Sequence, residues 1–109
     1  MPVNTGILRG LDQGHLAKSV AGAVDVTLSG DEARNQVIVF SGAITASINV
    51  NFPVAAETAG VIWFLDNDTT GAFTLTVKGT IGTGLAIAQG KQIVAEWTGA
   101  DFVAWTAEL

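Results

Sequence analysis

The sequence predicts an all-β protein, a small antiparallel β-sandwich or barrel of about eight strands with an extended N-terminal arm. Three observations lead to this fold class. From residue 23 onward, apolar and polar residues alternate or form short β-branched runs, a pattern typical of strands. Clusters of Gly, Asn, Asp and Ser interrupt these runs about every 8–12 residues, as in sandwiches and barrels. No long window after the arm has the 3.6-residue period of an amphipathic helix.

The N-terminal stretch differs in character from the rest of the chain. Residues 1–22 contain four glycines and one proline and show no clear period. We therefore predict an extended arm over 1–22 and a β-sandwich domain over 23–109. Two interpretations of the arm stay open at this point: a flexible tail, or a segment that docks on a neighbouring subunit.

The alternation defines the strands of the predicted domain. Val24, Val26 and Leu28 share one face of the first strand, and a helical turn over 32–35 follows it. Eight strands are predicted in all, at residues 24–28, 36–40, 44–50, 61–65, 73–77, 85–88, 92–98 and 102–106.

One of these strands and one turn carry further information. Residues 61–65 are apolar on both faces, so they should form a central strand or lie between the core and a subunit interface. Gln89 and Gly90 separate two apolar runs, which predicts a hairpin turn. A single sheet of eight strands would leave an apolar face in water, so we expect two packed antiparallel sheets or a small closed barrel.

Composition excludes several classes of function. Hydrophobic residues make up 49% of the chain and charged residues 14%, against about 25% charged in a typical domain, so part of the surface should meet another subunit. The net charge is −5 and the five basic residues stand singly. We expect no nucleic-acid partner, because phosphate binding needs clustered cations. The apolar runs are too short for a membrane span or a signal peptide.

No motif argues for catalysis or for a bound cofactor. The lone histidine, His15, lies in the arm, there is no cysteine, and no serine stands in a G-x-S-x-G context. Residues 84–91 look superficially like a phosphate loop, but five residues separate the glycines and Gln92 replaces the Ser or Thr. We therefore expect a protein that is not an enzyme.

One loop resembles the first half of a calcium-binding loop. Asp66, Asp68 and Thr70 alternate before Gly71, but Val77 occupies the twelfth position, where a bidentate Glu belongs. Asp and Asn also favour turns for local reasons. We interpret the loop as a structural turn and expect no metal site.

The aromatic residues of the strands are the candidate site residues. Trp63, Trp97 and Trp105 could stack on sugar rings, but each lies within an apolar strand pattern. We expect them, together with Phe64, to be anchors of the core or of a subunit interface.

Two blocks of sequence resemble a known module. The first is DVTLSGDEARNQVIVFSGAITA at 25–46, followed by a strand ending in Phe52-Pro53. The second is DTTGAFTLTVK at 68–78, followed by GTG at 82–84, QGK at 89–91 and TGADFV at 98–103. In order and spacing, both are similar to a β-module of tailed-bacteriophage structural proteins, including tail-fibre segments and small virion-surface proteins. Such modules often have a more polar segment where this chain has Trp63-Phe64-Leu65.

The resemblance covers roughly residues 23–106 and implies a virion role. A module that makes up nearly the whole chain looks like a capsid decoration (cement) protein, a class that typically sits as homotrimers on the outer shell, bound to the major capsid protein. The chain would then remain in the host cytoplasm until assembly. Candidate shell contacts in the arm are Ile7, Leu8, Leu11 and Leu16.

Two other functions remain open from the sequence. The first is a tail-fibre or baseplate-associated adhesion module, which could bind host glycans. The second, from another class, is a stand-alone carbohydrate-binding protein.

Overall fold

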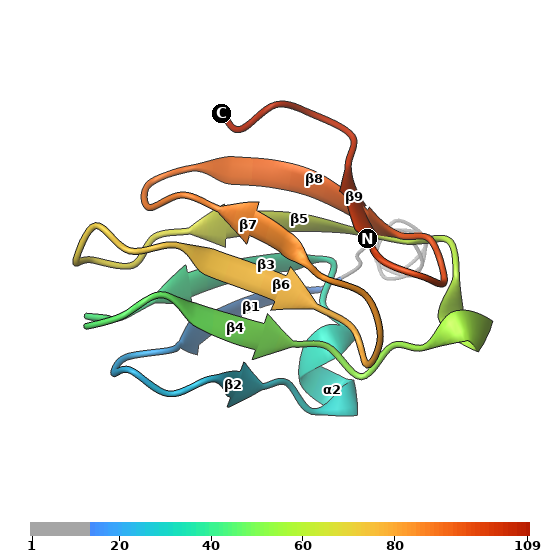
Figure 1. Ribbon diagram of the computed structural model, residues 1–109, viewed down its shortest axis with the longest axis horizontal. Helices are drawn as coiled ribbons and strands as arrows, with labels where there is room; N and C mark the ends of the chain where they lie inside the picture. The colour runs from blue at the N-terminus through green and yellow to red at the C-terminus, as the bar shows by residue number, and fades with distance from the viewer. Residues whose placement is uncertain (1–13) are drawn as a thin grey trace, which may run out of the picture.

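The computed structural model describes residues 14–109, which form two packed β-sheets (Figure 1). The five-stranded sheet has the order β1-β3-β5-β8-β9 and the four-stranded sheet the order β2-β4-β6-β7. The strands of the first are β1 (His15–Ser19), β3 (Val37–Ser41), β5 (Val61–Asn67), β8 (Gln92–Trp97) and β9 (Phe102–Ala104). The strands of the second are β2 (Val26–Thr27), β4 (Ile48–Asn51), β6 (Leu75–Lys78) and β7 (Leu85–Ile87). The predicted all-β, sandwich-like fold is confirmed, in the form of two separate sheets.

The strand directions differ from the prediction. Four of the seven strand pairs are parallel: β1 with β3, β3 with β5, β2 with β4, and β4 with β6. The chain crosses to the opposite sheet after each strand from β1 to β5, so it re-enters each sheet in the same direction. The other three pairs among the described residues are antiparallel: β5 with β8, β6 with β7, and β8 with β9. The prediction of antiparallel sheets was therefore wrong for most pairs.

At one end of the sandwich, the segments that connect the two sheets pair with one another. Parallel bridges join Gly22 to Ile44 and Ala43 to Thr70, so the backbone ladder continues outside the named strands. Gly71 shows why glycine is needed in such a crossing. Its φ is +114° and a Cβ there would lie 2.3 Å from the Ile44 carbonyl oxygen, which no other residue tolerates.

Between the sheets lies one hydrophobic core with an aromatic centre. Phe52, Trp63, Trp97 and Phe102 pack edge to face, with ring centroids 5.0–5.6 Å apart. Both buried indole N–H groups have partners, because Trp63 donates to the Ala33 carbonyl at 3.0 Å and Trp97 to the Ala55 carbonyl at 2.8 Å. The core is thus closed to solvent and its polar atoms are satisfied.

The N-terminal boundary also differs from the prediction. Residues 15–19, which we assigned to the arm, form β1 at the edge of the five-stranded sheet, and Val20 is buried. As an edge strand with Leu16 as its only large apolar residue, β1 has a weak alternation signal. The arm prediction for residues 1–13 lies outside the described part of the chain.

Three further predictions need correction. The strand predicted at 24–28 shrinks to β2, and Val24 is 76% exposed. The helical turn lies earlier, as α2 (Gly30–Ala33), because Ser29 and Glu32 form a capping box. A short 3-10 helix that we did not predict, η1 (Ala56–Thr58), precedes β5. The turn at 89–90 joins β7 to β8, which belong to different sheets, so it is not a hairpin.

Candidate interaction surface

The outward face of the five-stranded sheet has an apolar patch at its centre with polar residues around it, and we call it the apolar face. The strand register aligns its outward residues in rows across the sheet, and the central row contains His15, Val37, Phe64 and Val94. A neighbouring row contains Ala17, Val39, Asp66 and Gln92. Phe64, in the middle strand β5, is 46% exposed, so a large aromatic side chain lies in water at the centre of this face.

The outward face of the four-stranded sheet is polar by contrast. Its rows contain Asn49 beside Thr76, and Thr27 beside Asn51 and Lys78. The two sheets bury similar apolar residues against each other, so the difference lies only on their outer sides. One side of the sandwich has the composition of a solvated surface, whereas the other has an apolar patch at its centre with a polar surround.

A shallow groove of about 330 Å³ lies on the apolar face. Val37 and Val39 of β3, Phe64 of β5 and Val94 of β8 form its apolar lining, with Leu109 at one side. The groove also has polar lining residues, Asp66 and Gln92. Its size is at the lower end of the roughly 300–1,000 Å³ of small-molecule pockets, so it can accept one large side chain.

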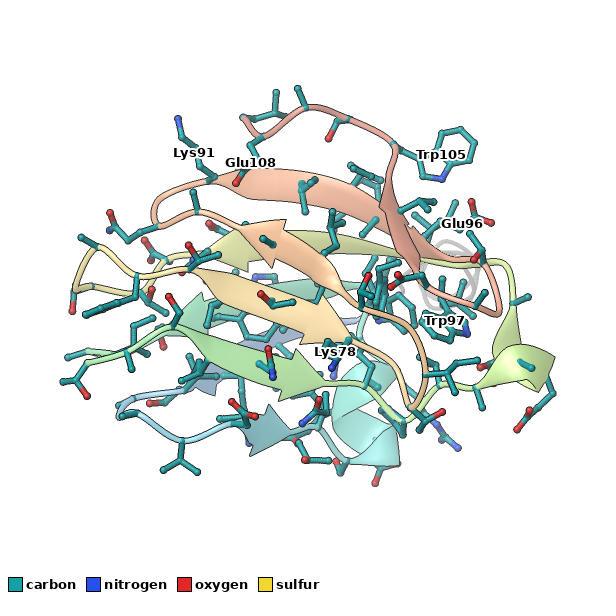
Figure 2. All side chains as sticks on the ribbon, in the orientation of Figure 1. Lys78, Lys91, Glu96, Trp97, Trp105 and Glu108 are labelled. Carbon is teal, nitrogen blue, oxygen red and sulfur yellow. The ribbon has the colours of Figure 1, made fainter. Side chains whose placement is uncertain are left out.

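The C-terminal segment completes this face. Leu109 exchanges backbone hydrogen bonds with Gln92 of β8 at 2.9 and 3.3 Å, and the Trp105 amide donates to the Val94 carbonyl at 2.7 Å. The Trp105 side chain is 65% exposed and its indole N–H donates to Glu96 Oε1 at 3.1 Å. Figure 2 shows this ring projecting beyond the ribbon, beside Glu96.

The tryptophans and Phe64, predicted as core or interface anchors, divide into two groups. Trp63 and Trp97 are buried in the core. Phe64 and Trp105 lie on the apolar face instead, one at its centre and one at its β9 side. The structure therefore brings two of the four predicted residues to the same surface.

Of the candidate shell contacts, only Leu16 lies among the described residues. It is half-buried in β1 and packs against the core, so its side chain is engaged within the fold. Ile7, Leu8 and Leu11 lie outside the described residues.

Sequence reasoning missed the valines of the groove and Leu109. The signal for Val37 and Val39 was present, since 36–40 is an uninterrupted β-branched run that is apolar at outward positions as well. Leu109 had no signal, because the pairing of its backbone with β8 depends on the tertiary fold.

Two carboxyl groups with lowered pKa values, Glu32 and Asp101, lie away from this face and form hydrogen bonds within the fold. The Lys18 ammonium, 2.7 Å from Glu32, and the Ser29 amide lower the pKa of the Glu32 carboxyl. Burial raises the pKa of Asp101, but hydrogen bonds from the amides of Gly84, Thr83 and Phe102 outweigh it, so the pKa of Asp101 lies below its usual value.

The loop that resembled a calcium site is used structurally. Asn67 is fully buried, its Nδ2 donates to the Ile87 carbonyl, and its Oδ1 accepts from the Thr69 amide and hydroxyl. Within residues 14–109, no group of three or more His, Cys, Asp or Glu side chains could hold a metal ion.

Comparisons with known proteins give no match: no protein-family model, curated protein or solved structure is similar to this chain at a significant level. Among the described residues, no helix has the length and apolar character that crossing a membrane requires.

Proposed function

We propose that this chain is a bacteriophage virion structural protein, a capsid decoration protein that binds the outer capsid surface as a homotrimer and stabilises the head. The observation that carries the proposal is the contrast between the two outer faces. A solvated polar face on one sheet and an apolar face with an exposed Phe64 on the other suit a protein held between partners.

The resemblance to tailed-phage β-modules gives the proposal its biological setting. Those modules are structural parts of virions, and the resemblance extends over roughly residues 23–106. A decoration protein stabilises a shell because it binds only the assembled state, so each bound copy shifts the equilibrium toward the intact head. The partners are then other copies of the chain and the major capsid protein, and the mechanism is binding without catalysis.

Copy number and location in purified particles test this function. Quantitative gel analysis should give about one copy per major capsid subunit, and cryo-electron microscopy should place trimers on the outer shell. Shells with the protein should also dissociate at a higher temperature than undecorated shells. A few copies at the tail would instead establish the adhesion module, and absence from every particle would remove the virion function.

One observation favours glycan binding as a second candidate function. Trp105 is 65% exposed and has a carboxylate, Glu96, beside it, and exposed aromatic rings with polar neighbours stack on sugars. Oligosaccharides should then quench the fluorescence of wild-type protein, with no effect on Trp105→Phe, since Trp63 and Trp97 are buried. An unchanged wild-type signal would exclude this site.

A further inference from the structure

We propose that the Trp105 side chain of one copy inserts into the groove on the five-stranded sheet of a second copy. The groove is the one lined by Val37, Val39, Phe64 and Val94. The inference rests on the proposed function, in which the chain acts as a homotrimer, and it specifies the contact through which copies meet.

The chain carries both halves of this contact. The protruding half is an indole ring that is 65% exposed, although tryptophan is normally mostly buried in a small domain. The receiving half is a groove of about 330 Å³ with apolar walls. Both lie on the outer side of the same sheet, close enough that the Trp105 amide bonds to Val94, a groove residue.

The indole N–H of Trp105 can keep a hydrogen-bond acceptor when the ring is inserted. Within one copy it donates to Glu96 Oε1, at an exposed position. Asp66, also a carboxylate, lies among the residues that line the groove. An inserted ring can therefore exchange one carboxylate acceptor for another, and its N–H does not become a buried donor without a partner.

The area of the apolar face limits how strongly two copies can associate through it. Five strands about 4.8 Å apart and about five residues long at about 3.3 Å each give a face of roughly 400 Å² in projection. Stable interfaces bury about 800 Å² of accessible surface per partner, so this face alone supplies about half of that area and the contact should be a weak one. In interfaces a few anchors carry most of the binding energy, and tryptophan is among the most common of them, so a weak contact should depend on its inserted ring.

The geometry allows two closed assemblies. A reciprocal contact, in which each Trp105 occupies the other copy's groove, gives a twofold dimer, and a one-way contact closes as a ring. A ring of three copies is the form that the proposed homotrimer requires. The mass of the assembly distinguishes the two forms, whereas the contact itself is tested by variants.

Sedimentation equilibrium with four forms of the full chain tests the contact. Wild type should associate with rising concentration, whereas Trp105→Ala lacks the inserted ring and Val39→Glu places a charge in the groove. Each should weaken association by at least about 30-fold, the effect of losing one interface anchor. Thr76→Glu, on the polar outer face, is the matched control and should associate as wild type does. Circular dichroism confirms that each variant is folded.

Mixing the two defective variants gives the sharpest test. Trp105→Ala keeps an intact groove and Val39→Glu keeps an intact indole, so together they should form a one-to-one complex although neither associates alone. The mixture should also protect Trp105 of the Val39→Glu chain from acrylamide quenching. Failure of the mixture to associate, or wild-type association of Trp105→Ala, would overturn the contact.

The outcomes separate this inference from the proposed function. A wild-type chain that stays monomeric throughout would overturn the contact, but particle analysis could still find decoration. Conversely, complementation of the variants together with absence from every particle would support the contact and refute the virion function.

Discussion

The packing of the hydrophobic core can be tested most directly at Trp63. Its ring is 2% exposed and packs edge to face on Phe52 and Phe102 at 5.0 and 5.6 Å, and its indole N–H bonds to the Ala33 carbonyl. Truncation to alanine removes the whole ring from the centre of the sandwich. Such truncations cost about 3–5 kcal/mol.

The local contacts place Trp63→Ala in the upper part of that range. The change abolishes two aromatic pairs, each contributing about 0.5–1.5 kcal/mol beyond area burial, and leaves the Ala33 carbonyl without its indole partner. We expect a loss of about 4–5 kcal/mol in the free energy of unfolding. A domain of this size has only about 5–15 kcal/mol in total, so the variant should be close to unfolded at 37 °C.

Urea unfolding followed by far-ultraviolet circular dichroism measures this loss without relying on the deleted fluorophore. Trp63→Phe retains the aromatic contacts and should lose only about 1–2 kcal/mol. Val24→Ala, at a 76% exposed position, should change stability by less than about 0.5 kcal/mol. A loss below about 1 kcal/mol for Trp63→Ala, or an equal loss for Val24→Ala, would refute the placement of the ring.

Three further predictions concern other parts of the fold. Gly79→Ala should cost about 1–3 kcal/mol in urea unfolding, since the new Cβ would lie 2.4 Å from the Trp97 ring; Gly30→Ala, where nothing lies within 4 Å, should cost nothing. Asn67→Ala should lower the unfolding free energy by about 2–4 kcal/mol, because it leaves buried partners unpaired, and near-neutral thermal melts would contradict that role. Because the folded pKa of Asp101 is lowered from 3.8, its contribution should be complete above about pH 4 and disappear as pH falls through the folded value. The stability gap between wild type and Asp101→Asn should thus be larger at pH 7 than at pH 3, and an equal gap would be inconsistent with the carboxylate's role.

The strand positions were largely predictable from the sequence. The run at 61–65 is apolar on both faces, and it becomes β5, the central strand of the five-stranded sheet, as predicted. The apolar pattern predicts such strands correctly, because the position of a residue in a strand determines which face of the sheet its side chain occupies. It fails for Val24, where the crossing between β1 and β2 overrides the local pattern.

The candidate surface was predictable only in part. The low charge content indicated that some surface would meet another subunit, and Phe64 and Trp105 were among the predicted anchors. Which of the aromatic residues enter the core could not be read from the sequence. Trp97 and Trp105 both follow apolar strand patterns, but only Trp97 faces the opposite sheet.

By itself, the sequence determined the all-β class, the approximate positions of the strands and the low content of charged residues, and it left a sandwich and a barrel both open. The tertiary structure decided the strand directions, the position of the edge strand β1, and the joining of Val37, Val94 and Leu109 into one groove. The physical reason is that periodicity records which face of a strand is buried. Which strand lies beside it, and in which direction, depends on whether the chain turns back within its sheet or crosses to the other, and that choice is made by contacts between residues far apart in sequence.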